Sequence, residues 1–406
     1  MRAKLSVIAV AAALLYGLSG AASAQFISNV SQTGADNDAN VLQQNYFGGV
    51  QTVTINQNGN SNTASADQQN NRSVSQTIDQ LGDNNSASIV QFRIGESSAA
   101  ISQTGSANTA AILQQWLLGS SASISQNGNG NSGTINQVPP VAPGLDPRSD
   151  QSSANITQQG NDNTATINQV GVNTSTSGGG ATATINQIQG VHNNAATINQ
   201  NPNSQNSVAV ITQDAHGFGF AGSFDTATVT QTGHDQTANV AQGSGGGSTV
   251  SVVQTGDTNS ASADQVTFGS SIDISQSGSL NSAKVKQTLA LSNTATVTQT
   301  GLSNSATVNQ GLTINETGNT ANVTQNGTGN SASVTQGATS PTAQANFNDA
   351  TIMQDGSANV ATINQSGLGT GSSHNTASIT QTGFGNTANV SQAGGAGNHA
   401  TVVQHP

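Results

Sequence analysis

One twelve-residue pattern recurs along most of this chain and constrains its fold more than any other feature. Every copy of the pattern Q-x-G-x-x-N-x-A-x-x-x-Q keeps the glycine, while the asparagine is replaced once, by Gln236, and the alanine once, by Gly133. Successive copies commonly start 22 or 23 residues apart. This period indicates a fold in which one small unit repeats and packs on its neighbours. The thirteen copies start at Gln32, Gln57, Gln80, Gln103, Gln126, Gln158, Gln231, Gln254, Gln276, Gln299, Gln325, Gln354 and Gln381.

Within a copy, residue types alternate with a period of two. In residues 304–310 the even positions hold Asn, Ala, Val and Gln, and the odd positions hold Ser, Thr and Asn. This alternation predicts a strand with one buried face, and the β-branched residues also favour a strand. The preceding residues 299–304 have the composition of a turn, with Gly301 available for a positive φ. Each copy therefore predicts a strand, a turn and a second strand.

We predict an all-β protein, a β-solenoid of stacked strand–turn–strand repeats of about 22–23 residues. Equivalent strands stack about 4.8 Å apart in two facing parallel sheets, a cross-β, amyloid-like arrangement of roughly 30 strands. One layer buries too little apolar surface to offset its loss of backbone entropy, so the layers must stack. Stacking also lets each inward amide pair with its copy above and below, whereas an unpaired buried amide costs a few kcal/mol.

The inward polar residues are the candidate functional positions, since they would specify register in the stack. We expect Gln and Asn to form ladders, Gly to occupy the corner and Ala to pack in the core. These positions are Gln103, Gly105, Asn108, Ala110, Gln114, Gln158, Gly160, Asn163, Ala165, Gln169, Gln254, Asn259, Gln265, Gln276, Asn281, Gln287, Gln299, Gly301, Asn304, Ala306, Gln310, Gln381, Asn386 and Gln392.

Residues 1–24 have the pattern of a secretory signal peptide. Arg2 and Lys4 precede an apolar stretch that ends in the small-residue site Ala22-Ser23-Ala24. Without Arg2 and Lys4, 5 basic residues face 18 acidic ones, so the exported chain carries a charge of −13. This balance argues against nucleic acid as a partner, because phosphate binding needs clustered Lys and Arg.

The rest of the chain divides at one proline-rich segment. We expect repeats in 25–137, a loop in 138–150, which holds four of the seven prolines, and repeats with Gly- and Ser-rich insertions in 151–406. The insertions near 170–181, 214–225, 337–349 and 366–375 are expected to bulge at corners. Around Glu316 the spacing is compressed, which predicts a local register defect. Trp116 follows Gln114 at a turn, and we expect it to pack over a layer edge.

The repeat resembles the curlin repeat of bacterial curli subunits, S-x5-Q-x-G-x-x-N-x-A-x3-Q. This pattern opens at Ser97, Ser152, Ser248 and Ser270, and at Ser120 with Gly133 in the alanine column. Other copies, such as those before Gln299 and Gln325, carry Asn in the Ser column. The resemblance covers nearly all of the chain after the leader. It adds Ser97 and its equivalents to the ladder positions.

The resemblance implies a secreted structural subunit that assembles with itself into extracellular curli-like amyloid fibres at the cell surface, for biofilm matrix and cell adhesion. It also implies a nucleator subunit and an outer-membrane secretion channel as partners. Two departures stand out: this chain has about three times the usual number of repeats, and Gln25 runs straight into the first repeat.

Two other classes of protein fit parts of the pattern. A capped monomeric β-solenoid at the surface, ice-binding or adhesin-like, would use outward threonines such as Thr164 and Thr166, repeated as Thr182 and Thr184. An enzyme on a β-helix would need converging acids or bases. The acidic residues and the six histidines show neither clustering nor ligand spacing. We therefore expect no catalysis, cofactor, metal or small-molecule substrate.

Overall fold

The structure is a computed structural model in which the chain divides into two compact units, Met1–Val208 (unit 1) and Ala209–Pro406 (unit 2). The described residues contain strands and turns and no helix, so none of them forms a helix that could cross a membrane. The residues described are 7–9, 24–44, 48–138, 148–149, 151–170, 180–201, 204–214, 224–243, 246–311, 316–337, 347–367 and 374–405.

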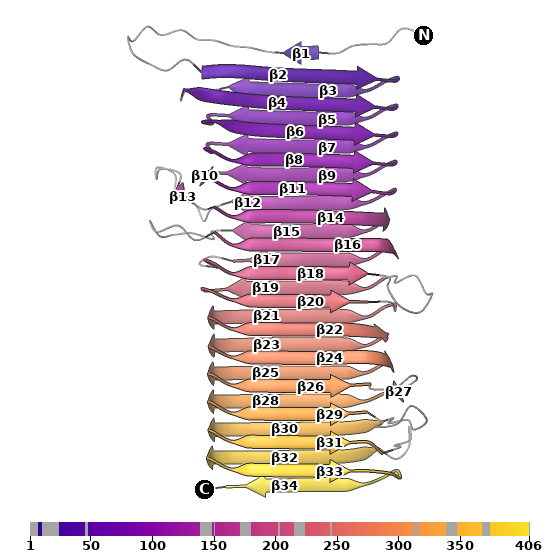
Figure 1. Cartoon of the computed structure of the whole chain (residues 1–406), viewed down its shortest axis with the longest axis vertical. Helices are drawn as coiled ribbons and strands as arrows, with labels where there is room; N and C mark the ends of the chain where they lie inside the picture. Colours follow the sequence, from indigo (N-terminus) through magenta and orange to yellow (C-terminus); the bar gives the residue numbers. More distant parts are fainter. Residues whose placement is uncertain are drawn as a thin grey trace. The chain divides into compact units, whose positions relative to one another are not determined.

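Unit 1 consists of two parallel sheets whose strands alternate along the chain (Figure 1). Sheet A1 contains, in spatial order, β1 (Val7–Ala9), β3 (Asp38–Gln44), β5 (Thr63–Gln69), β7 (Ser86–Phe92), β9 (Thr109–Gln115), β12 (Ser132–Val138), β15 (Thr164–Val170) and β17 (Ala195–Gln200). Sheet B1 contains β2 (Ala24–Thr33), β4 (Gly49–Asn58), β6 (Val74–Leu81), β8 (Ser98–Thr104), β11 (Ser121–Asn127), β14 (Ser153–Asn161) and β16 (Thr182–His192). A separate parallel pair joins β10 (Leu117–Leu118) to β13 (Arg148–Ser149).

Unit 2 has the same construction. Sheet A2 contains β19 (Thr226–Thr232), β21 (Thr249–Asp257), β23 (Ser271–Ser279), β25 (Thr294–Leu302), β28 (Thr320–Thr328), β30 (Asn348–Ser357), β32 (Asn375–Phe384) and β34 (His399–Gln404). Sheet B2 contains β18 (Val208–Asp214), β20 (Thr237–Gln242), β22 (Ser260–Phe268), β24 (Ser282–Leu291), β26 (Ser305–Gln310), β29 (Ser331–Gln336), β31 (Val360–Gln365) and β33 (Thr387–Gln392). The short β27 (Glu316–Thr317) pairs with the end of β24.

The predicted β-solenoid of two parallel sheets is confirmed. The described residues form 34 strands, of which four are two or three residues long and 30 are longer. Equivalent residues of the repeat stand directly above one another: Gln276 pairs with Gln299, and Gln299 with Gln325. Register is strongly specified because a slip of one residue would turn every buried side chain to the outside.

The core lies between the two sheets of each unit and is built from the alternating residues. In β8 and β9 of unit 1, Ala99, Ile101, Ala110 and Ile112 are all at most 3% exposed. The intervening residues point outward and are half-buried or exposed, giving patterns such as eBiBiB over β26. One small and one β-branched residue per strand make each layer thin, so the apolar contacts run mainly along the stack.

Two parts of the predicted chain organisation lie mostly outside the described residues. Of the leader, the structure describes 7–9 and 24, and the backbone of Val7–Ala9 pairs with Ala39–Val41. Of the proline-rich segment it describes Val138, which ends β12, and the two residues of β13. Most of each Gly- and Ser-rich insertion is also outside, although strands end and begin on either side of all four.

The predicted register defect around Glu316 is wrong. The strands on either side keep their register, with Thr294 opposite Thr320 and Gln299 opposite Gln325. Glu316 and Thr317 instead add a two-residue pairing to Ala290 and Leu291. The expected compression is also wrong, because Gln299 and Gln325 are 26 residues apart, more than the usual 22 or 23. The additional residues lie between the end of β26 at Gln310 and the start of β28 at Thr320, outside these two strands. Register shifts occur in two other places, after Gln158 in β14 and after Val266 in β22.

Candidate functional site

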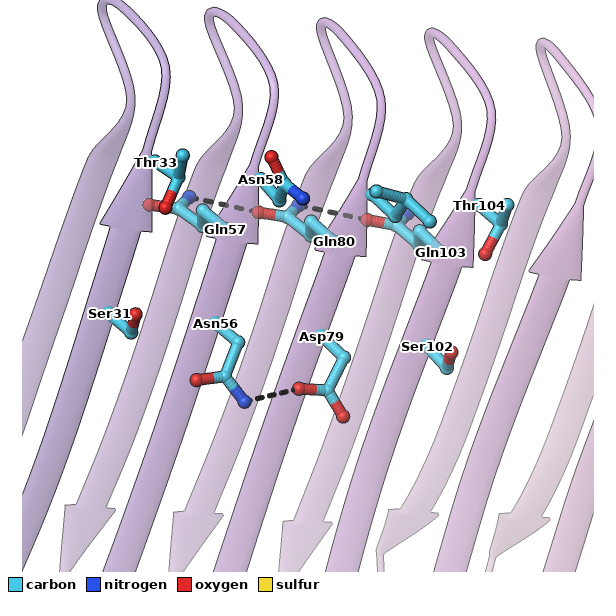
Figure 2. A pocket seen from close by; sticks show the side chains of 11 residues that line it. Ser31, Thr33, Asn56, Gln57, Asn58, Asp79, Gln80, Ser102, Gln103 and Thr104 are labelled. Carbon is cyan, nitrogen blue, oxygen red and sulfur yellow. Dashed lines mark hydrogen bonds between the residues drawn. The ribbon is translucent and has the colours of Figure 1, made fainter.

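The buried glutamines form continuous hydrogen-bonded columns, one along each sheet of each unit. In sheet B1, Gln57 Nε2 donates to Gln80 Oε1 at 2.9 Å, and Gln80 Nε2 donates to Gln103 Oε1 at 2.9 Å (Figure 2). In sheet A2, Gln276 Nε2 donates to Gln299 Oε1 at 2.8 Å. The side chains are at most 2% exposed. Burial in a low-dielectric interior strengthens such a ladder, and it would make a single missing partner costly.

In most ladder glutamines, such as Gln103 and Gln276, the second N–H of the amide joins one sheet to the other. Gln103 Nε2 also donates to the Ser86 carbonyl at 3.0 Å, and Gln276 Nε2 to the Ser260 carbonyl at 3.0 Å. In each case the acceptor lies on the facing sheet. Both amide hydrogens are therefore used, one along the stack and one across it. A glutamine satisfies this geometry because its primary amide carries two donors and one acceptor.

Asparagines form a second set of columns at the corners. Asn108 donates from both its backbone N–H and its Nδ2 to Asn85 Oδ1, each at 3.1 Å. Its Nδ2 also donates to the Gly128 carbonyl of the following layer at 2.7 Å. Asn304 repeats the contact to Asn281 Oδ1 in unit 2. The asparagine column satisfies turn backbone groups that would otherwise be unpaired.

The two kinds of ladder have opposite directions. Each glutamine amide donates to the glutamine of the next layer in the chain, whereas each asparagine donates to the asparagine of the preceding layer. The stack of layers within each unit is therefore polar, and its first and last layers present different hydrogen-bonding groups.

In each unit, serine takes the place of asparagine in part of one corner column. Ser97 is 3% exposed, and its Oγ accepts from the Ser120 N–H at 3.1 Å. Ser270 Oγ likewise accepts from the Asn293 N–H at 3.1 Å. Both side chains place an oxygen above the backbone N–H of the next layer. This shared role explains why Ser and Asn exchange in that column of the repeat.

The glycine of the repeat is required by the close approach of successive corners. Gly105 and Gly301 have φ values of 112° and 113°. A Cβ on Gly105 would overlap the carbonyl oxygen of Gly128, and one on Gly301 would overlap that of Gly327. Both obstacles are backbone atoms, so neither can rotate away. The invariant glycine is thus explained by strain and by contact together.

The structure places every predicted position in one of these columns. Ala110, Ala165 and Ala306 are at most 2% exposed, and Gly160 has a φ of 109°. Asn386 donates its N–H to Asn359 Oδ1 at 3.0 Å. The glutamine columns hold Gln103, Gln114, Gln158, Gln169, Gln254, Gln265, Gln276, Gln287, Gln299, Gln310, Gln381 and Gln392, and the asparagine columns hold Asn108, Asn163, Asn259, Asn281, Asn304 and Asn386.

The pattern search missed some members of the ladders. Gln187, Gln200 and Gln213 continue the columns although none of them opens a full copy of the repeat. Their signal is the shorter alternation TINQ or VITQ with a terminal glutamine. Asp225 also stands in an asparagine column, where its Oδ1 accepts from the Ser248 N–H at 2.9 Å. Burial raises the pKa of Asp225 to about 6, and the Ser248 hydrogen bond partly opposes that rise.

On the outer face of sheet A1, three asparagines form a shorter ladder: Asn136 Nδ2 donates to Asn168 Oδ1, and Asn168 Nδ2 donates to Asn199 Oδ1, each at 2.9 Å. A shallow groove crosses β2, β4, β6 and β8, and in it Asn56 Nδ2 donates to Asp79 Oδ1 at 2.7 Å (Figure 2). Thr164 and Thr166 lie on β15 of sheet A1, whereas Thr182 and Thr184 lie on β16 of sheet B1. The four threonines therefore do not form one array. Among the described residues, no three His, Asp or Glu side chains come together as a metal site.

Comparison with known families gives four matches, all within unit 2. Residues 245–288, 269–311, 346–374 and 373–405 match the curlin associated repeat. No curated protein matches the chain. The matched segments contain members of the glutamine, asparagine and glycine columns of unit 2, among them Gln276, Asn281 and Gly301.

Proposed function

The chain belongs to the curlin repeat family, and from this premise we propose that it is a secreted structural subunit that polymerises into curli-like amyloid fibres outside the cell. The fibre would serve as biofilm matrix and in cell adhesion. The observation that carries the proposal is the polarity of the amide ladders at the edges of the stack. It is supported by the predicted leader in residues 1–24, which would direct the chain to export.

The last strands of unit 2 offer groups that a further layer could bind. Within the described residues, β33 and β34 each pair with a single long strand. Gln392 Nε2 of β33 donates to the Thr376 carbonyl, which leaves its second N–H available. Asn398 donates to Asn375 Oδ1, and its own Oδ1 accepts no hydrogen bond from the described residues. This edge therefore offers an amide donor in the glutamine column and an oxygen acceptor in the asparagine column.

The first layers of unit 1 offer the complementary groups. Gln32 Nε2 donates to Gln57 Oε1, while Gln32 Oε1 receives no donor from the described part of the chain. Asn37 Oδ1 is already bound by Asn62, as expected for a column that continues in one direction only. A second copy whose β33 and β34 meet this edge would continue both ladders in the same sense. Parallel strand addition to an open edge would supply the backbone hydrogen bonds.

The leader would influence when this edge is open. Val7–Ala9 pairs with β3 in unit 1, so cleavage after Ala24 would remove β1 and uncover the backbone of Ala39–Val41. Assembly would then follow export. A nucleator subunit and an outer-membrane channel are the further partners that the family suggests for this route.

The test is to release the chain without residues 1–24 from denaturant and follow its assembly. We expect fibres that bind amyloid dyes and give a meridional reflection at about 4.7–4.8 Å. A folded, soluble monomer without that reflection would contradict the proposal and favour a capped solenoid. A matched preparation that keeps residues 1–24 is expected to assemble more slowly, because β1 covers one of the two strands at the first edge.

A further inference from the structure

The turns that follow β5, β7 and β9 in unit 1 form a corner that, among the described residues, is alone in stacking an arginine on aromatic rings. Arg93 lies against two rings there: its guanidinium carbon is 4.3 Å from the Trp116 ring centroid and 5.4 Å from the Phe92 ring centroid. The two rings meet edge to face at 6.2 Å. Trp116 is the only tryptophan of the chain, and both rings are half-buried.

Positive charge gathers at the same corner. The chain has three arginines beyond residue 4, and the turns bring the backbones of all three together. Arg72 bridges Gly95 in the next turn, Gly95 bridges Leu118, and Arg148 pairs with Leu117 through β13. Figure 1 shows β10 and β13 side by side at this end of the strands. The rest of the chain is acidic, so this clustering runs against its overall charge of −11.

The Arg93 guanidinium packs against two rings and makes no hydrogen bond to the described residues. Among the described residues it has no ion pair, and its contacts are the two stacked rings. Stacking fixes the plane of the guanidinium and leaves its N–H groups directed along that plane, which suits bidentate binding of a carboxylate. Glu96 and Asp67 lie on the neighbouring turns and strands, and neither forms an ion pair with Arg72 or Arg93.

The corner is anchored firmly enough to hold a ligand. Leu117, next to Trp116, is 1% exposed and packs with Val74 and Ile94 in a small apolar cluster below the turns. The Trp116 N–H donates to the Phe92 carbonyl, and the Arg93 N–H to the Gln69 carbonyl, so successive turns are joined by backbone bonds. The ring and the guanidinium are thus presented on a rigid support, as affinity requires.

We propose that this corner, defined by Arg72, Phe92, Arg93 and Trp116, binds an acidic polysaccharide. Carboxylates on successive sugars would accept from the guanidinium groups of Arg93 and Arg72, which lie in adjacent turns of the stack. The apolar faces of the sugar rings would pack against the exposed part of Trp116 and Phe92. The proposal deepens the matrix role proposed above by naming a matrix component that the subunit would bind.

A carboxylated sugar polymer fits the corner better than a nucleic acid does. A duplex presents one charge per about 1.7 Å, and protein surfaces that bind it usually contact many phosphates. The two described guanidinium groups would contact few of those phosphates, and the acidic remainder of the protein would repel the others. A polymer that alternates carboxylates with apolar ring faces suits a corner that combines two guanidinium groups with two aromatic rings.

The single tryptophan makes the test direct. The full-length chain is titrated with polygalacturonate while Trp116 fluorescence is recorded, with dextran as a neutral polymer and duplex DNA as a different polyanion. We expect a saturable change with polygalacturonate alone, weakened by added NaCl. Arg93→Gln should raise the dissociation constant about tenfold or more, because it removes charge-assisted hydrogen bonds. Lys284→Gln removes the same charge from an outward position on sheet B2 and should leave binding unchanged.

Several results would overturn the proposal. These are the absence of a saturable change, equal binding of dextran, DNA binding as tight as polygalacturonate binding, or an Arg93→Gln variant that binds like the parent. Arg93→Lys serves as a second variant: it keeps the charge but loses the planar fork, so it should also bind more weakly. The readout does not depend on fibres. A monomer that binds polygalacturonate would contradict the assembly proposal alone, and a fibre that does not bind it would contradict only this one.

Discussion

At the scale of single residues, backbone geometry explains why every copy of the repeat keeps its glycine. Gly301 and Gly329 belong to the same two layers of unit 2, and both have positive φ values, 113° and 65°. A Cβ on Gly301 would meet the backbone of Gly327, whereas a Cβ on Gly329 would meet nothing within 4 Å. The two positions therefore separate conformational strain from steric overlap.

We predict that Gly301→Ala destabilises unit 2 by about 3 kcal/mol or more, since it combines strain with backbone overlap. Gly329→Ala should destabilise unit 2 by only about 1–2 kcal/mol, because a residue with a Cβ is disfavoured in the left-handed backbone conformation. Hydrogen exchange of the amides in β25 and β28 would measure both effects. Equal protection in the two variants would show that the corner can spread apart.

At the scale of an element, a ladder depends on every member having the same chemistry. Asp225 departs from this rule because it places a carboxyl group in a column of amides and hydroxyls, where it is 2% exposed. Desolvation raises its pKa from 3.8 to about 6, and the Ser248 N–H lowers it in part. The folded chain therefore holds this proton more tightly than the unfolded chain does.

The sign of the resulting pH dependence follows from linkage. The stability linked to Asp225 is complete below about pH 4 and is lost as the pH rises through about 6. We predict that unit 2 is more stable at pH 4 than at pH 7 by about 3 kcal/mol from this group. Asp225→Asn should remove that difference by stabilising unit 2 at pH 7, as measured by hydrogen exchange of β19 and β21. Asp235→Asn, on an exposed turn, is the control and should leave the difference in place.

At the scale of the whole molecule, the direction of the backbone bonds identifies residues that face a further layer. In this stack, N–H groups of outward-facing residues donate to the next layer, as Thr376 does to the Asn398 carbonyl and Ser331 to the Asn359 carbonyl. Thr401 of β34 has the same parity, so its N–H points away from β32. A change there can alter the edge and leave the pairing of β32 with β34 intact.

Thr401→Pro is accordingly predicted to stop growth at the edge formed by β33 and β34. Proline lacks the backbone N–H that would donate a hydrogen bond to a carbonyl of the next strand, and proline is tolerated on edge strands. The measurement is dye-monitored elongation from preformed seeds, where the variant should add far more slowly than the parent. Thr401→Val keeps the N–H and should elongate normally. Normal elongation of the proline variant would mean that this edge is not the one that grows.

The local sequence pattern was sufficient to predict much of the fold and of the candidate site. Alternation along residues 304–310 predicts which side chains are buried, because a strand has only two faces. The same alternation places Gln299, Asn304 and Gln310 inward, and an inward amide requires a partner in the adjacent layer. The strand type, the repeat length and the identity of the ladder residues all follow from contacts within one or two repeats.

Features that depend on stacking could not be obtained in this way. Thr164 and Thr182 look equivalent in the sequence but lie on different sheets, and Glu316 leaves the neighbouring register undisturbed. The opposite directions of the two ladders, and the corner where Arg93 meets Trp116, arise only when layers some 23 residues apart are superimposed. The amino-acid pattern determines the strands, the buried side chains and the ladder residues of each layer, because these depend on interactions within one or two repeats. The tertiary structure decides what adjacent layers present together, because that depends on how the turns between them are stacked.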